Sequence, residues 1–203
     1  MSRVAYPKGI KPMLDSTSKN KKANTSRKPY LQGHGNRGMD FENDLNSTNE
    51  YYTEKGIALI TKRPTPINVV KVDYTKGAII TQAFFQTQST TDCNGVYRGQ
   101  YIDFEAKSTR STTSFPLANI PPQQIAHLER VIEQKGWAFF LIDFASLNEV
   151  YFLPASYVIE FYRSRPRGSI PLNDIKEHGS KIKEGFSPRY DYLTEAIKYF
   201  EKK

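Results

Sequence analysis

Hydrophobic and polar residues recur with two different periods along the chain, and these periods predict a mixture of helices and strands. Apolar spacings of three and four predict helices over residues 39–55, 122–135, 155–163 and 191–201. Short apolar or alternating runs predict strands over residues 57–60, 100–108, 137–144 and 149–153. Residues 164–189 show neither period and are expected to be irregular. The order predicts an α/β fold, a mixed sheet flanked by helices.

A β-hairpin is predicted between the first two of these strands. Residues 67–74 and 78–86 are strand-like and flank the turn Thr75-Lys76-Gly77. The prolines of Pro64-Thr65-Pro66 interrupt pairing before it, because proline cannot donate to a ladder. The hairpin is therefore expected to leave the main sheet. Four of its side chains are expected to stay outside the core: Lys71, Lys76, Phe84 and Phe85.

The strand predicted over residues 100–108 carries the most informative chemistry. Alternation directs Ile102, Phe104 and Ala106 to one face, and Tyr101, Asp103, Glu105 and Lys107 to the other. Asp92 lies upstream, before a turn expected at Asn94-Gly95. Two carboxylates and an ammonium suit metal-assisted attack on a phosphodiester, since acids hold Mg²⁺ and lysine offsets developing negative charge. An amphipathic strand with solvated charges would show the same spacing.

Other residues add to this picture or exclude alternatives. Gln124, at the start of a helix, offers an amide oxygen to a magnesium shell, or is an ordinary polar residue at a helix N-terminus. The three histidines lack zinc-ligand spacing, and His127 is expected at the surface. Cys93 has no evident histidine partner for nucleophilic chemistry. The sequence lacks a glycine-rich phosphate loop after a strand, which argues against nucleotide hydrolysis.

Positive charge is concentrated at one end of the chain. The net charge is +8, and residues 1–38 hold nine Lys or Arg and one acid, so the remainder is neutral. A cationic arm that is disordered alone gains affinity for polyphosphate by releasing counterions. A merely solubilising tail is the alternative; binding to an acidic membrane is disfavoured because the arm lacks an amphipathic face. A single cysteine, no signal-like start and no long apolar run predict a cytoplasmic protein.

Several segments together resemble a known family. They are Asn36-Arg37-Gly38-Met39-x-Phe41-Glu42, Thr65-Pro66, Thr90-Thr91-Asp92-x-Asn94-Gly95-Val96-Tyr97, Tyr101-Ile102-Asp103-Phe104-Glu105-Ala106-Lys107, Ser114-Phe115-Pro116-Leu117 and Arg189-x-Asp191-Tyr192. In order and spacing they are similar to the RecU family of Holliday-junction resolvases, within the restriction-endonuclease-like class. The resemblance covers nearly all of the chain from residue 36.

The resemblance implies a division into a flexible basic arm, residues 1–35, and a nuclease domain, residues 36–203, with a protruding hairpin stalk at about 64–88. It implies catalysis by Asp92, Glu105 and Lys107 and binding of Mg²⁺, or Mn²⁺ in its place, by Thr90, Asp92, Glu105 and Gln124. The expected DNA contacts come from the arm, the start of the domain and the stalk: Lys8, Lys11, Lys21, Lys22, Arg27, Lys28, Arg37, Lys71, Lys76, Phe84 and Phe85.

The expected activity is Mg²⁺-dependent paired nicking of four-way junction DNA by a homodimer, in recombination and repair. A recombinase and branch-migration proteins are expected partners through the resemblance alone. Two alternatives stay open from the residues themselves. One is a restriction or repair nuclease that acts on duplex DNA. The other is a non-catalytic protein that binds junctions and anneals strands.

Overall fold

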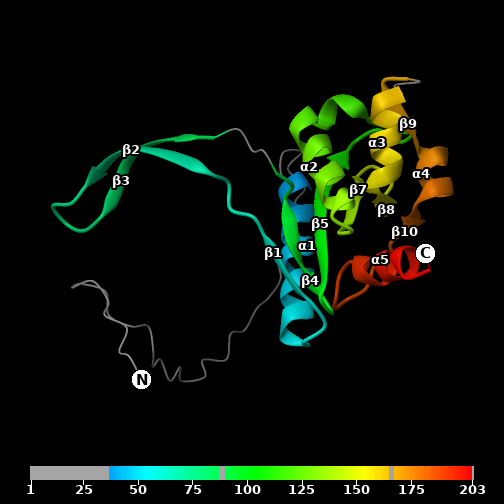
Figure 1. Cartoon of the computed structure of the whole chain (residues 1–203), viewed down its shortest axis with the longest axis horizontal. Coiled ribbons are helices and arrows are strands. Elements are labelled where there is room, and N and C mark those ends of the chain that lie inside the picture. Colours follow the sequence, from blue (N-terminus) through cyan, green and yellow to red (C-terminus); the bar gives the residue numbers. More distant parts are fainter. Residues whose placement is uncertain (1–36, 87–89, 165–166, 203) are drawn as a thin grey trace. The chain divides into compact units, whose positions relative to one another are not determined.

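The computed structural model describes residues 37–86, 90–164 and 167–202. Its helices are α1 (Arg37–Glu54), α2 (Pro122–Glu133), α3 (Ala155–Ser164), α4 (Leu172–His178) and α5 (Tyr192–Phe200), with a 3₁₀ turn at Leu117–Asn119. Six strands form the main sheet: β1 (Leu59–Lys62), β4 (Cys93–Tyr97), β5 (Gln100–Thr109), β7 (Trp137–Phe144), β8 (Glu149–Pro154) and β10 (Ser180–Lys181). The predicted α/β class is confirmed, and Figure 1 traces the elements in chain order.

The main sheet is mixed, with strand order β1-β4-β5-β7-β8-β10. Strands β5 and β7 are parallel, and every other neighbouring pair is antiparallel. All eight residues of β7 are buried, as expected for a central strand covered on both faces. The parallel pairing requires a crossover, which α2 supplies between β5 and β7.

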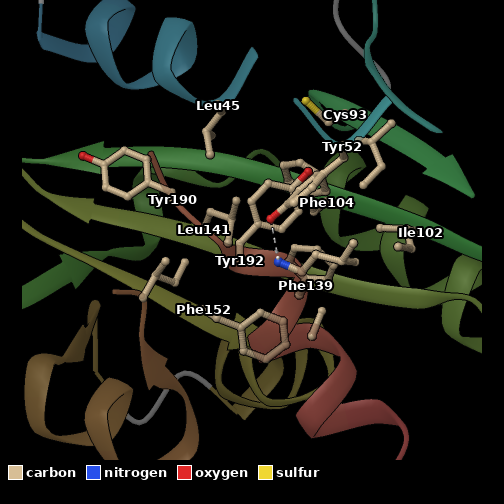
Figure 2. Close-up of a cluster of buried hydrophobic side chains, with 14 of the residues drawn as sticks. Leu45, Tyr52, Cys93, Ile102, Phe104, Phe139, Leu141, Phe152, Tyr190 and Tyr192 are labelled. Atoms are coloured by element: carbon tan, nitrogen blue, oxygen red, sulfur yellow. Dashed lines mark hydrogen bonds between the residues drawn. The ribbon is translucent and has the colours of Figure 1, made fainter. Parts of the chain in front are cut away.

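The sheet separates two hydrophobic cores. One core packs α1 and α5 against the sheet and includes Leu45, Phe104, Phe139 and Tyr192. Figure 2 shows Leu45 of α1 and Tyr192 of α5 lying against Phe104 of β5 and Phe139 of β7. The Phe104 and Phe139 rings stack with centroids 4.9 Å apart. Apolar residues of α2, α3 and α4 form the second core on the opposite face, so helices cover both sides as predicted.

The predicted hairpin is present as β2 (Ile67–Asp73) and β3 (Ile79–Phe85), a two-stranded sheet separate from the main one. Every residue of β3 is exposed, and so are the first five residues of β2. A hairpin with exposed apolar residues on both faces is unusual for an isolated protein and indicates a contact surface.

Two local predictions were wrong. Asn94 and Gly95 lie within β4 and not in a turn, which instead falls at Arg98 and Gly99, both with positive φ. Gly95 is needed because β1 approaches so closely that a Cβ atom would lie 2.1 Å from the Leu59 carbonyl oxygen. Any side chain at this position would clash with β1, so Gly95 allows close strand packing and does not form a turn.

The second error concerns residues 164–189, which were expected to be irregular. Their described part contains α4, β10 and β9 (Ser169–Pro171), and β9 pairs with β6 (Ser114–Pro116). Ile170 of β9 and Ile175 of α4 are fully buried in the second core, which anchors these two elements, and β10 pairs with β8. Within the described residues, no helix is both long and apolar enough to cross a membrane.

Candidate active site

The predicted acidic strand is β5, and its two faces differ as the alternation predicts. Ile102 and Phe104 are fully buried in the core under α1 and α5. Asp103 and Glu105 alternate with them and are also buried, with exposed fractions of 0% and 1%. Buried carboxylates are rare and need hydrogen-bond or ionic partners. The opposite face of β5 is therefore a polar site built into the sheet.

Glu105 is the centre of the site. Its Oε1 atom lies 2.6 Å from the Lys107 ammonium and accepts a hydrogen bond of 2.7 Å from Gln124 Nε2. Its Oε2 atom accepts a 3.1 Å hydrogen bond from the backbone N–H of Asp92. Burial raises the pKa of Glu105 to about 7, the Asp92 charge adds to the rise, and Lys107 opposes it. The carboxyl group is thus held in a poorly solvated place beside a second acid.

Asp92 is fixed to β5 by a reciprocal pair of hydrogen bonds. Its backbone N–H donates to Glu105, and its Oδ2 atom accepts from the backbone N–H of Ala106 at 3.1 Å. The last β4–β5 pair is Cys93 with Phe104, so the Asp92 side chain continues the ladder where the strand ends. This brings the second predicted acid beside the first, across 13 residues of sequence.

Gln124 joins them from the first turn of α2. Pro122 starts this helix, and Ile125 and Leu128 bury its apolar side in the second core. Gln124 is only 3% exposed, and its Oε1 atom finds no hydrogen-bond partner within the described residues. A buried carbonyl oxygen without a partner is costly. It marks a place where a cation or a donor would be stabilised.

The oxygen atoms gathered here fit a hard divalent cation. Across residues 37–86, 90–164 and 167–202, no group of three or more His, Cys, Asp or Glu residues is placed to hold a metal ion by itself. The site instead has two carboxylates and an amide oxygen, a set compatible with Mg²⁺, which often uses only one or two carboxylates. Thr90 is half-buried in the same loop, two residues before Asp92.

The predicted DNA-binding residues fall into two groups. Six of them, Lys8, Lys11, Lys21, Lys22, Arg27 and Lys28, lie outside the described residues, as does the whole arm of residues 1–35. Arg37 is the first residue of α1. In the hairpin, Lys71 and Lys76 are exposed, and the exposed fractions of Phe84 and Phe85 are 59% and 82%.

Sequence reasoning missed a second polar cluster beside these residues. It is centred on the buried Asp103 and includes four further side chains: Arg63, Thr91, Tyr101 and His127. His127, which was expected at the surface, is only partly exposed: its side chain is 22% exposed and its Nε2 atom lies 2.9 Å from Asp103 Oδ2. Two sequence spacings could have indicated this cluster. Asp103 shares a strand face with Glu105, and His127 follows Gln124 by one helical turn.

The chain thus folds as a mixed sheet in which Asp92, just before β4, meets Glu105 and Lys107 of β5 beside the crossover helix α2, as the family resemblance implies. The family model for RecU, recombination protein U, matches residues 36–198. The chain belongs to this family.

Curated relatives agree with the family match. A protein of Geobacillus sp. (strain WCH70) named Holliday junction resolvase RecU is 48% identical over 200 residues, covering 96% of each chain. Proteins of the same name from Lactococcus lactis subsp. lactis (strain IL1403) and Streptococcus sanguinis (strain SK36) are 46% and 51% identical. They cover 94% and 81% of this chain, and 95% and 84% of their own lengths. Among solved structures, the Holliday junction resolvase Hjc of Archaeoglobus fulgidus is similar, with TM-score 0.40, 12% identity and coverage of 69% of this chain and 93% of that chain.

Proposed function

We propose that this protein is a structure-specific endonuclease that resolves Holliday junctions by paired nicking dependent on Mg²⁺ or Mn²⁺. The observation that carries the proposal is the convergence of Asp92, Glu105, Lys107 and Gln124 on one side of β5. The chain's place in the RecU family and the names of its relatives point to junction DNA as the substrate. Two carboxylates beside an amide oxygen favour a cation, and the neighbouring ammonium favours an anionic substrate.

The contacts of Asp92, Glu105, Gln124 and Lys107 support the following roles, whereas the role of Thr90 rests on the family resemblance. Asp92, Glu105, Gln124 and Thr90 would hold the divalent ion, which supplies positive charge that polarises the phosphate and acidifies water. Glu105 is oriented by the Asp92 N–H and the Gln124 amide, so its lone pairs need little reorganisation. Lys107 has a side chain that is 20% exposed and already adjoins Glu105. Its ammonium would meet negative charge that develops on the phosphate oxygens.

DNA binding would use residues other than the catalytic set. The arm lysines and arginines, with Arg37, would neutralise backbone phosphates and make affinity depend steeply on salt. Lys71 and Lys76 would do the same on the hairpin. Phe84 and Phe85, exposed on β3, would stack on bases at the open crossover, which is worth about 1–3 kcal/mol per base. Paired cuts in two strands require two sites, which a two-fold homodimer supplies.

The test compares nicking of a four-way junction with cleavage of a linear duplex of the same sequence, in Mg²⁺, Mn²⁺ or EDTA. Asp92→Asn and Glu105→Gln should bind junctions at wild-type affinity and cut at least about 100-fold more slowly. Glu149→Gln is the control, because Glu149 also pairs with a lysine, 2.7 Å from Lys181, but on β8. Equal cleavage of duplex and junction would favour a duplex nuclease. Junction binding without any nicking would favour a non-catalytic annealing protein.

A separate experiment tests the hairpin. Phe84→Ser and Phe85→Ser should each weaken junction binding by about 5- to 150-fold, the equivalent of one lost stack. Phe186→Ser is the matched control, since Phe186 is 96% exposed and lies outside the hairpin. If all three variants lost affinity equally, exposed aromatic surface in general would explain the result, and the stalk would have no special role.

A further inference from the structure

Asp103, which is fully buried, is the hub of a polar cluster that the proposed chemistry does not use. Its Oδ2 atom accepts hydrogen bonds of 2.8 Å from Arg63 Nη2 and from the Tyr101 hydroxyl, and lies 2.9 Å from His127 Nε2. Its Oδ1 atom accepts from the Thr91 hydroxyl. A buried carboxylate costs several kcal/mol unless its partners are well placed, and a fully satisfied network is correspondingly rigid. We call these five residues the Asp103 cluster.

The cluster lies on the same three segments that carry the candidate ligands. Three of its members each share a segment with one ligand: Thr91 with Asp92, Asp103 with Glu105, and His127 with Gln124. The separations are one residue in the loop, two residues on one strand face and three residues on one helix side, all of which place neighbours together. Fixing the cluster therefore fixes the ligand segments relative to one another.

Arg63 connects the cluster to the loop that carries Asp92. Its backbone N–H donates to the Asp92 carbonyl at 2.8 Å, which extends the β1–β4 ladder by one step. Its side chain donates to Thr91 Oγ1 at 2.9 Å and to Asn94 Oδ1 at 3.2 Å. Thr91 is fully buried and is held from two sides, by Arg63 and by Asp103. The residue directly before Asp92 is thus pinned.

We propose that the Asp103 cluster is a positioning device, in which Arg63, Thr91 and His127 hold Asp92, Glu105 and Gln124 in a common geometry for a divalent cation. The proposal rests on the function proposed above, because it assigns the orientation of the same ligands. Outer partners of metal ligands commonly change metal affinity or activity by 10- to 100-fold when removed. A cluster that merely stabilises the fold would change the melting temperature without changing the affinity of folded protein for metal.

Thr91 offers a matched pair of substitutions. Thr91→Val keeps the side-chain shape and removes the hydroxyl, whereas Thr91→Ser keeps the hydroxyl and removes a methyl group. If the hydroxyl positions Asp92, the Val variant should bind Mn²⁺ about 10- to 100-fold more weakly by calorimetry, and the Ser variant should stay close to wild type. If Thr91 only fills space, the order should reverse, because the Ser variant leaves the cavity.

A second readout needs no metal. The Asp92 and Ala106 amides donate to the Glu105 and Asp92 carboxylates, so loss of positioning should speed their hydrogen exchange in the Val variant alone. The other β5 amides should stay protected in both variants. Unchanged exchange together with unchanged Mn²⁺ affinity in Thr91→Val would overturn the proposal.

Asp103→Asn extends the test to the hub, with Glu149→Gln as its control. Both acids accept a hydrogen bond from a tyrosine two residues away and pair with basic side chains, Arg63 and His127 for Asp103 and Lys181 for Glu149, but Glu149 lies on β8. Only Asp103→Asn should lose Mn²⁺ affinity, and both variants should bind junctions normally in EDTA. A wild-type protein that binds Mn²⁺ but never nicks would sink the proposed function and leave the positioning intact. Equal Mn²⁺ affinity in Asp103→Asn and wild type would sink the positioning alone.

Discussion

Replacing Gln124 by Met tests whether its orphan oxygen is a metal ligand. The change removes a hydrogen bond to the Glu105 carboxylate, which is worth about 1.5–3 kcal/mol. It also removes a buried oxygen that has no partner within the described residues, which relieves a cost of about 1–3 kcal/mol. Methionine has a similar length and fills the same space. Without metal the two effects offset each other, so the melting temperature should change little.

Mn²⁺ should stabilise the wild-type protein more than the Gln124→Met variant. At an Mn²⁺ concentration 100-fold above the wild-type dissociation constant, binding stabilises the native state by about 2.7 kcal/mol. If losing Oε1 weakens binding about 10- to 100-fold, the variant gains only about 0.4–1.4 kcal/mol at that concentration. The difference of about 1.3–2.3 kcal/mol corresponds to about 3–9 °C in melting temperature for a domain of this size.

The assay is a thermal melt of each protein in Mn²⁺ and in EDTA, without DNA. Gln134→Met is the control, because Gln134 is an exposed amide at the C-terminal end of the same helix. The control should show the full wild-type response to Mn²⁺. An equal Mn²⁺-induced shift in Gln124→Met and wild type would refute the assignment of Oε1 as a ligand.

Three shorter predictions follow from the same geometry. Lys107→Met should retain junction binding and lower single-turnover cleavage by about 100- to 1000-fold, because it removes charge that acts on the transition state; a loss of affinity without a loss of rate would contradict this. Cys93 is 3% exposed and burial raises its pKa to about 12, so a thiol reagent at pH 8 should label it only after unfolding. Gly95→Ala should lower the melting temperature markedly by forcing β1 from β4, because a Cβ atom would lie 2.1 Å from the Leu59 oxygen, whereas Gly168→Ala meets no atom within 4 Å and should not.

The parts of the site that could be predicted from sequence are those that depend on local period. Alternation along β5 places Glu105 and Lys107 opposite Phe104 whatever the rest of the chain does. The first turn of α2 follows from Pro122 and the apolar stripe after it. Each of these relations is contained within ten residues, so side-chain period and helix-start rules suffice.

Contacts between residues far apart in the sequence could not be predicted in this way. Arg63 reaches Asp103 over 40 residues and His127 reaches it over 24. His127 follows Gln124 by one helical turn, but no local pattern identifies Asp103 as the partner of either residue. The β4 strand was hidden for a different reason. Asn-Gly is the commonest signal for a tight turn, yet here Gly95 is required because the neighbouring backbone of β1 lies too close for a side chain. Tertiary packing decided these positions.

The same packing supports the proposal that the site binds a cation. β5 lies between two apolar cores, and its register sets Glu105 beside Phe140 of β7, which is fully buried. In these apolar surroundings solvent screens the repulsion between the Glu105 and Asp92 carboxylates only weakly. Burial and the Asp92 charge therefore both raise the pKa of Glu105. Lys107 offsets one of the two negative charges. Within the described residues the Gln124 oxygen has no partner, and one divalent ion would relieve both that oxygen and the remaining charge, which supports the proposed cation site.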